Sequence, residues 1–471
     1  MQIKKVVLIS LLNNFPNKNL LYFKGSFLNS LKLFNVFILI VYFCTSSVAQ
    51  EKIVGHGGPV KGLTISETGF LVSTSFDYSS IIWSIDQMQE VITLNDHIAA
   101  VNVAEFSPNQ KKLVTAGDDM RVLIYDVKEL SKIPKARELG SHLGKVSDLT
   151  FSNKGNFMAS SGWDGSIIIW DMIKEKKYIT TSAGHKGPIN SIQFSKDGKY
   201  LFSSGYDGTV RKFDIFNNVS KGIVISHGWG INVFYINEEK KSIIYGTTDG
   251  SIILKDLNNN KNILKIGDER TPVLTMCLDK NESMIAFGNA KGRVIMISLE
   301  DYSLVRDFRA AHGPVWALAL NNESTMLYVG GLDDFINQWD LVSYPQPVIM
   351  PPGPARRFNP SQLLSNGQKQ FARKCSVCHT LVADSKRRAG PTLYKLFGRR
   401  AGSLQDYKYS DTLIQSEIVW NAESIHRLFT EGPDVVLPGT KMPIQRMKSS
   451  KDRVDLINFL KVATENNDLT Q

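Results

Sequence analysis

Short apolar or alternating runs recur along the middle of the chain, and glycine and aspartate bound each of them. SIIIWDM (166–172) and INSIQFS (189–195) are two examples. Runs of this length and alternation are typical of β-strands. Asp-Gly pairs that begin at 164, 207 and 249 favour tight hairpin turns between such strands. The pattern therefore predicts a middle region built from short antiparallel strands.

Three markers in this region share one period of 42 to 45 residues, which indicates an internal repeat. The first marker is a turn acid, the second lies six residues later, and the third is a histidine upstream. The turn positions are Asp77, Asp119, Asp164, Asp207, Asp249, Lys291 and Asp333. The positions six residues later are Trp83, Tyr125, Trp170, Phe213, Lys255, Ile297 and Trp339. The upstream positions are His56, His97, His142, His185, His227, Arg270 and His312.

These markers, together with Trp-Asp at 170–171 and 339–340, resemble the WD-repeat family over residues 50–342. The resemblance implies an all-β, seven-bladed propeller with four strands per blade, which acts as a protein-interaction scaffold. A strand-like segment at 51–55 precedes the first repeat, and nothing after Asp340 offers a replacement. We therefore expect this N-terminal strand to complete the seventh blade beside residues 335–342, which leaves no long open edge.

Six histidines around one ring leave two interpretations open. They could hold a central metal or a second haem, or they could be buried packing groups. In the resembled family, the histidine bonds the turn acid, while a strand Ser or Thr and the Trp complete a buried network. His142, Asp164, Ser160 and Trp170 match one such set. We favour the packing role, because a buried imidazole needs a fixed acceptor.

The sixth repeat departs from the pattern of the others. This repeat carries Arg270, Lys291 and Ile297 in place of the three markers, so we expect its blade to be the least rigid or to be used for contacts. Cys277 lies in a strand-like run and is predicted to be a small buried apolar residue.

The N-terminus carries the pattern of a secretory signal peptide, predicted to occupy residues 1–49. An apolar run of 11 residues (33–43) is interrupted only by Asn35, follows several lysines and precedes the small residues 45–49. The run is shorter than the roughly 20 residues of a spanning helix. Cleavage after Ala49 is favoured over an uncleaved anchor. Both versions predict an exported protein of the periplasm, soluble or anchored at its N-terminus.

A proline-rich linker is predicted at 343–358, since residues 341–360 hold six of the 17 prolines. Beyond it, residues 375–379 read Cys-Ser-Val-Cys-His, the attachment signal of c-type haem. On a helix, positions i, i+3 and i+4 share one face, so two sulfurs and one imidazole can meet the same porphyrin. A thioredoxin-type pair would follow a strand, whereas helical spacing with a candidate cap at Ser361 precedes Cys375. A zinc site needs further ligands, and only His426 remains downstream.

Residues 359–466 resemble class I cytochrome c of the mitochondrial and α-proteobacterial type, and a tail follows at 467–471. The resemblance rests on the order of Ala-Gly-Pro (389–391), Leu-Phe-Gly-Arg (396–399), Pro-Gly-Thr-Lys-Met (438–442) and the terminal apolar segment 455–461. It implies an all-α domain with one covalently bound haem c. It also implies that Gly367 and Phe371 meet Leu456, Phe459 and Leu460 where the terminal helices cross.

The resemblance assigns the site residues in turn. Cys375 and Cys378 would form the thioethers, and His379 and Met442 would be the axial iron ligands. The carbonyl of Pro391 would accept the imidazole N–H. The residues expected around the haem propionates are Arg399, Tyr409, Trp420 and Thr440. Phe429 stands where many relatives have a tyrosine near the distal sulfur, and His426 is the rival sixth ligand outside the motif.

Composition and charge then narrow the function. Four cysteines are too few for a disulfide framework. The net charge of +10 divides into +5 for residues 1–49, −3 for 50–354 and +8 for 355–471. The middle region is therefore not a nucleic-acid binder on charge grounds. The basic haem domain predicts a docking edge for acidic partners. The side chains expected at that edge are Lys374, Lys386, Arg387, Arg400 and Lys441.

Together these features predict an exported electron carrier, with no catalytic residue of its own, tethered to a propeller that binds a protein partner. The expected redox partners are an oxidase, a reductase or a dehydrogenase, with no nucleic acid, and with a membrane only if the leader is uncleaved. Two alternatives remain. One is an enzyme whose propeller holds a substrate or second cofactor and uses the haem as an electron port. The other is a redox-responsive regulator or assembly factor.

Overall fold

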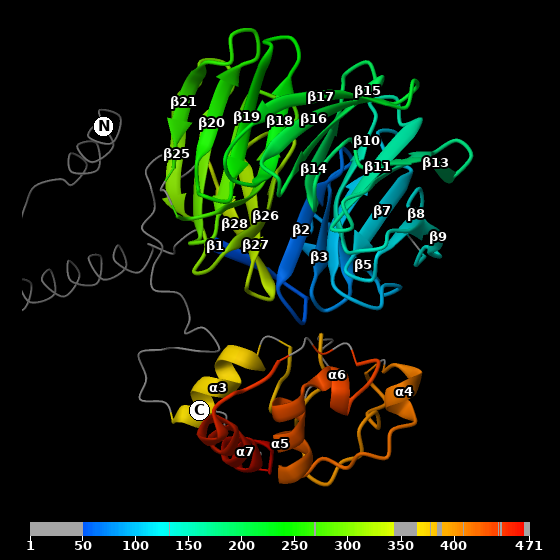
Figure 1. Ribbon diagram of the computed structural model, residues 1–471, viewed down its shortest axis with the longest axis vertical. Coiled ribbons are helices and arrows are strands. Elements are labelled where there is room, and N and C mark those ends of the chain that lie inside the picture. Colours follow the sequence, from blue (N-terminus) through cyan, green and yellow to red (C-terminus); the bar gives the residue numbers. More distant parts are fainter. Residues whose placement is uncertain are drawn as a thin grey trace, which may run out of the picture. The chain divides into compact units, whose positions relative to one another are not determined.

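The computed structural model describes residues 50–130, 132–267, 270–342, 365–376, 378–383, 389–407, 409–440, 442 and 445–465 (Figure 1). The predicted leader, the linker at 343–358 and the tail at 467–471 lie outside these residues, so their boundaries stay predictions.

Residues 50–340 form seven antiparallel sheets of four strands each. Six of the sheets take their strands in chain order, and the glycines of the three Asp-Gly pairs, Gly165, Gly208 and Gly250, have positive φ, as tight turns favour. The strands of the first three sheets are β2 (Val60–Ile65), β3 (Phe70–Ser75), β4 (Ser80–Ser84), β5 (Gln89–Leu94); β6 (Val101–Phe106), β7 (Lys112–Gly117), β8 (Arg121–Asp126), β9 (Arg137–Ser141); and β10 (Val146–Phe151), β11 (Phe157–Gly162), β12 (Ile167–Asp171), β13 (Lys176–Thr181). The strands of the next three are β14 (Ile189–Phe194), β15 (Tyr200–Gly205), β16 (Thr209–Asp214), β17 (Val219–Ser226); β18 (Ile231–Asn237), β19 (Ser242–Thr247), β20 (Ile252–Asp256), β21 (Asn262–Ile266); and β22 (Val273–Leu278), β23 (Met284–Asn289), β24 (Arg293–Ser298), β25 (Leu304–Arg309).

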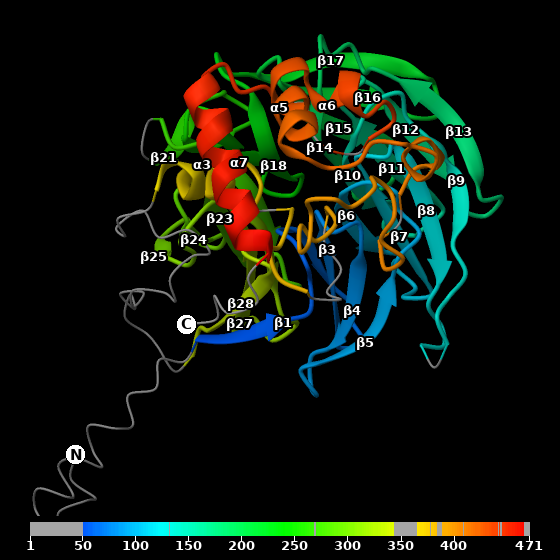
Figure 2. The same ribbon diagram turned by 90° about the horizontal axis from the view of Figure 1, so that it is seen from below.

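The seventh sheet joins the two ends of the repeat region. It has the order β1-β28-β27-β26, built from β1 (Gln50–Val54), β26 (Val315–Leu320), β27 (Met326–Gly331) and β28 (Phe335–Asp340). Ile53 pairs with Ile336 in antiparallel register, and Figure 2 shows blue β1 beside yellow-green β28. The prediction that an N-terminal strand completes the last blade is confirmed.

The seven sheets are the blades of a closed propeller. The first strand of each blade packs against the first strand of the next, and β26 packs against β2 to close the ring. The core lies between neighbouring blades, where side chains such as Ile82, Leu113 and Tyr125 are fully buried in one apolar cluster. Burying both faces of every blade explains why these strands are apolar over most of their length.

A buried hydrogen-bond network holds the turns of the repeat, as the sequence predicts. In the third blade, His142 Nδ1 lies 3.2 Å from Asp164 Oδ2 and its Nε2 lies 2.8 Å from Ser160 Oγ. Trp170 Nε1 donates to the same Ser160 hydroxyl at 3.0 Å. Each polar atom of the set thus has a partner inside the blade.

Three other blades repeat the bonds of the histidine to a turn acid and to a strand hydroxyl. The pairs of histidine and turn acid are His56 with Asp77, His97 with Asp119, and His185 with Asp207, at 3.0, 2.9 and 3.1 Å. In the fifth blade the separation grows, because His227 Nε2 lies 3.7 Å from Asp249 Oδ2. The network therefore weakens toward the sixth blade.

The sixth blade forms all four strands although its repeat markers are missing. Asn289 replaces the turn acid in function, since its Oδ1 accepts from the backbone N–H of Lys291 at 2.9 Å and of Arg293 at 3.0 Å. Ile297 is fully buried where other repeats have an aromatic side chain. Cys277 is half-buried against the neighbouring core cluster, and burial raises the pKa of its thiol to about 12. The expected low rigidity of this blade stays a prediction.

In the described residues from 365 onward, regular structure consists of five helices and one isolated β-bridge between Arg400 and Val419. The helices are α3 (Asn366–Lys374), α4 (Asp411–Ile414), α5 (Ala422–Glu431), α6 (Pro433–Val436) and α7 (Ser450–Glu465).

The start of α3 corrects one prediction. The helix is capped by Ser365 rather than Ser361, because Ser365 and Gln368 form a reciprocal capping box directly before the first turn. Ser361 itself lies outside the described residues.

The first and last helices of this domain cross closely, as the sequence predicts (Figure 2). A β-carbon on Gly367 would lie 2.1 Å from the carbonyl oxygen of Asp455, so only glycine permits this approach. Phe371 and Phe459 pack beside the crossing with ring centroids 5.6 Å apart. Leu456 and Leu460 of α7 are buried in the same cluster.

Within the residues that the structure describes, no helix is long and apolar enough to span a membrane.

Candidate haem-binding site

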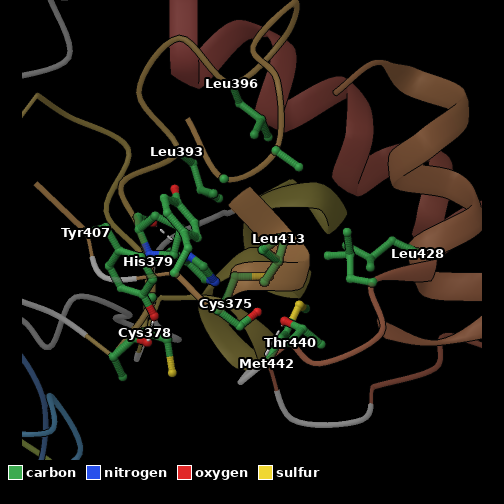
Figure 3. A pocket seen from close by; sticks show the side chains of 18 of the residues that line it. Cys375, Cys378, His379, Leu393, Leu396, Tyr407, Leu413, Leu428, Thr440 and Met442 are labelled. Atoms are coloured by element: carbon green, nitrogen blue, oxygen red, sulfur yellow. Dashed lines mark hydrogen bonds between the residues drawn. The ribbon is translucent and has the colours of Figure 1, made fainter. Parts of the chain in front are cut away.

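The Cys-x-x-Cys-His residues follow directly from the end of α3. Cys375 is the C-cap of this helix, and its backbone N–H bonds the carbonyl of Phe371 at 2.8 Å. The chain continues in a tight turn, in which the N–H groups of Cys378 and His379 both bond the carbonyl of Cys375, at 3.1 and 2.9 Å. The turn brings both thiols and the imidazole to one cavity (Figure 3).

The imidazole of His379 is oriented by its backbone surroundings. Its Nδ1 donates to the carbonyl of Pro391 at 2.7 Å, which leaves Nε2 as the nitrogen available for a metal. A β-carbon on Gly390 would lie 2.4 Å from the ring, so glycine is required for the ring to lie against this backbone. Burial lowers the pKa of His379, against the opposing effect of the Pro391 bond, and so favours the neutral, metal-binding form.

Met442 contributes to the same cavity from the loop after α6. Its side chain is half-buried against the core of the domain, and its backbone N–H bonds Thr440 Oγ1 at 3.2 Å. Figure 3 shows Met442 beside Thr440. Helix α5 adds Leu428 and Phe429 to the cavity lining. His426, the rival sixth ligand, is not among the lining residues.

All four residues predicted to surround the propionates line the cavity: Arg399, Tyr409, Trp420 and Thr440. Arg399 donates to the carbonyls of Tyr394 and Thr392, each at 2.7 Å. The guanidinium is thus fixed by its own loop, and its contact with a propionate stays a prediction. Burial raises the pKa of Tyr409, so this phenol keeps its proton and can donate.

Several residues that line the cavity were not predicted as site residues from the sequence. Tyr407 packs edge-on against Tyr409 with ring centroids 4.8 Å apart, and its hydroxyl donates to the carbonyl of Ala389 at 2.7 Å. Because Tyr407 lies two residues before Tyr409, the sequence could have indicated that both belong to the same site. Ser410 Oγ lines the cavity, is buried and has no hydrogen-bond partner among the described residues. Leucines form much of the apolar wall, and those labelled in Figure 3 are Leu393, Leu396, Leu413 and Leu428. A leucine in the sequence does not by itself indicate a binding site.

These contents fit a haem. The cavity is lined mainly by aliphatic and aromatic side chains, as a porphyrin requires. A thiol pair, an imidazole with one fixed nitrogen and a thioether all reach it. A buried hydroxyl without a partner is also suited to a polar group of a ligand.

The basic docking edge is described only in part. Arg400 lines the cavity, and Lys374 ends helix α3 immediately before Cys375. Lys386, Arg387 and Lys441 lie outside the described residues, so the predicted edge stays a prediction.

The potential metal-binding side chains of the propeller are arranged differently from those of the haem domain. Over its described strands and turns, no group of three or more His, Cys, Asp or Glu side chains is placed to hold a metal ion. His56, His97, His142 and His185 each bond a turn acid and a strand hydroxyl within their own blade. This engagement supports their interpretation as packing groups.

Comparison with protein families gives two matches in the order that the structure shows. The model "WD domain, G-beta repeat" matches residues 88–126, 134–171, 176–214 and 302–340. The model "Cytochrome c" matches residues 364–464.

Individual relatives agree with the second match. Cytochrome c of Gibberella zeae is 38% identical over 102 residues, which cover 22% of this chain and 95% of the relative. Cytochrome c of Cochliobolus lunatus is 41% identical over 99 residues, covering 21% of this chain and 91% of the relative. Cytochrome c of Arabidopsis thaliana is 40% identical over 99 residues, covering 21% and 88%.

Through its C-terminal domain the chain belongs to the cytochrome c family, and it joins that domain to a seven-bladed WD-repeat propeller. The cofactor is a covalently bound haem c. When bound, this group supplies a reversible one-electron couple at its iron.

Proposed function

We propose that this protein is an exported electron carrier whose haem domain is presented to a redox partner by the propeller. The observation that carries the proposal is the cavity, where His379 and Met442 are both lining residues, together with the two cysteines of the attachment motif. If His379 and Met442 both hold a haem iron, no position would be left for a substrate and the potential of the group would be raised. The chain would then act as an electron carrier rather than as an enzyme.

The chain's own residues have distinct tasks in this function. Pro391 holds the imidazole orientation through the Nδ1 bond, so that Nε2 points to the ligand position. The aliphatic walls exclude water and reduce the solvent rearrangement that accompanies a change of charge. An all-α fold of the domain, as in class I cytochromes, agrees with the five described helices.

The propeller contributes a protein-binding surface in this proposal. Its blades expose several large apolar side chains, among them Leu143, Trp163, Tyr206 and Trp229, with exposed fractions of 92%, 53%, 69% and 62%. Exposed aromatic side chains are enriched where proteins bind one another. A propeller bound to a partner would raise the local concentration of the haem at that partner's redox centre. The basic residues of the haem domain would then steer docking to an oxidase, a reductase or a dehydrogenase.

The decisive experiment is spectroscopy and metal analysis on the full-length protein purified with its haem. We expect one iron and one covalent haem per chain, no copper, and a low-spin spectrum. The oxidised protein should show the weak near-infrared band of methionine–iron ligation. Ready binding of carbon monoxide to the reduced protein at neutral pH would contradict the closed iron. Two haems or bound copper would instead support an enzyme with a second cofactor in the propeller.

A further inference from the structure

Among the described residues before and at Met442, few hydrogen bonds hold the chain near this side chain. In the described part of the loop before Met442, Thr440 makes two hydrogen bonds. Its backbone N–H donates to the carbonyl of Leu437 at 3.0 Å, and its hydroxyl accepts from the backbone N–H of Met442. The anchoring contacts instead follow Met442, at residues 445–448. Gln445 Nε2 donates to the carbonyl of Lys374 at 3.1 Å, and Met447 N–H bonds the carbonyl of Phe429 at 2.8 Å.

Arg446 makes the most extensive of these side-chain contacts. Its Nη2 lies 3.1 and 2.9 Å from the two carboxylate oxygens of Asp434, and its Nε donates to the carbonyl of Glu431 at 2.7 Å. Glu431 is the last residue of α5 and Asp434 lies in the first turn of α6. Arg446 therefore satisfies a carbonyl that the end of α5 would leave without a partner, while it pairs with a charge on the next helix.

A glycine makes room for this arrangement. Gly432 joins the two helices with φ +106°, a conformation that favours glycine. A β-carbon at this position would lie 2.4 Å from Asp434 Oδ1 and 2.9 Å from Arg446 Nε. A side chain at residue 432 would therefore displace the guanidinium as well as strain the backbone.

We propose that Arg446 is a positioning residue for Met442. By fastening residues 445–447 to the junction of α5 and α6, it keeps the thioether of Met442 beside the cavity wall that Leu428 and Phe429 form. Three residues lie between Met442 and Arg446, so release of the guanidinium removes a fixed point close to the thioether and leaves this segment held by the bonds of Gln445 and Met447. The inference rests on the proposed axial role of Met442.

The test uses imidazole as an exogenous ligand of the oxidised full-length protein, because imidazole binds only when Met442 leaves the iron. Arg446→Gln removes the charge and the paired donors while the buried core stays unchanged. We expect about a five-fold gain in imidazole affinity, the size appropriate for a partly exposed ion pair with an added hydrogen bond. The methionine–iron band should weaken in parallel.

Arg427→Gln is the matched control. Arg427 pairs with the Glu431 carboxylate at 2.9 Å on the exposed face of α5 and makes no described contact with the Met442 loop. The Arg427→Gln substitution removes the same charge from α5, the helix whose last carbonyl Arg446 bonds, so we expect wild-type imidazole affinity. Arg446→Lys keeps the charge but not the forked geometry, and should give an intermediate affinity.

Three outcomes separate the possibilities. Equal gains in both Gln variants would overturn the inference, because the effect would then follow charge or helix stability alone. Unchanged affinity in Arg446→Gln would overturn it too; if that variant fails to fold, Asp434→Asn must show the gain instead. Absence of the methionine–iron band from the wild-type protein would contradict the proposed ligation itself, which is a different failure.

Discussion

Histidine serves opposite purposes in the two parts of this protein. In the propeller, His142 bonds Asp164 through Nδ1 and Ser160 through Nε2, so both ring nitrogens are used within the blade. In the haem domain, Nδ1 of His379 bonds Pro391, and the ring is one wall of a cavity. The role of a buried imidazole therefore depends on whether its second nitrogen is hydrogen-bonded within the domain or is available to a ligand.

The same contrast extends to the folding of each part. The propeller completes its polar network with its own Asp, Ser, Thr and Trp side chains, and the ring closes through β1 and β28. The haem domain encloses a cavity between the turn after α3, helix α5 and the Met442 loop, and residues of its core cluster line that cavity. We therefore expect the propeller to be stable by itself and the haem domain to depend on its cofactor.

The largest expected effect comes from removing the thiols. Cys375→Ser with Cys378→Ser should abolish covalent haem, because no sulfur remains for the thioethers. We expect no haem stain on a denaturing gel and loss of the haem-domain transition in calorimetry, with the propeller transition retained. Cys277→Ala, in the propeller, is the control and should keep the full haem content. Loss of both transitions would show that the two parts are not independent in stability.

A second variant tests the haem domain through its helix crossing. Gly367→Ala places a β-carbon 2.1 Å from the carbonyl of Asp455, so α3 and α7 must move apart. Overpacking of this kind costs about 3 kcal/mol. Guanidinium unfolding followed at the haem absorbance measures the loss. Gly228→Ala in the propeller meets nothing within 4 Å, and it should leave that midpoint unchanged. An unaltered midpoint in Gly367→Ala would contradict the tight crossing.

The smallest effect concerns the propeller network and its dependence on pH. Burial disfavours the Asp77 carboxylate, but the ion pair with His56 and the bonds from Ser79 and Gly57 outweigh burial and lower its pKa to about 2. A lowered folded-state pKa gives stability that is present above the unfolded value of 3.8 and is lost as pH falls toward 2. Asp77→Asn should therefore cost about 2 kcal/mol at neutral pH.

Denaturant midpoints of the propeller transition at several pH values check this prediction. The difference between wild type and Asp77→Asn should shrink as the pH falls through the range from 3.8 to about 2. Asp86→Asn removes a carboxylate of an exposed turn and is expected to leave the midpoint nearly unchanged. If the difference in midpoint between wild type and Asp77→Asn stayed constant with pH, the charge of Asp77 would contribute little to the stability of the propeller.

Much of the fold was predictable because its signals are local and periodic. One 42- to 45-residue period fixes the number of blades, and the segment before His56 predicts the closing strand β1. Five adjacent residues, 375–379, are sufficient to predict covalent haem. The helix cap at Ser365 was missed, because Ser361 and Ser365 are equivalent until the capping partner Gln368 is placed.

The repeat, the attachment motif and the family of the haem domain can be predicted from the amino-acid sequence alone. Each depends on residue types at fixed short spacing, and hydrogen bonding within one hairpin or one helical turn gives that spacing a physical meaning. Only the tertiary structure decided that Asn289 takes over the turn bonds of the sixth blade, that Gly390 makes room for the His379 ring, and that Arg446 fastens the Met442 loop. The last two contacts join segments that are separate in the chain, and the first depends on a turn closing around a substituted residue. Such contacts form only when the tertiary fold brings these segments together.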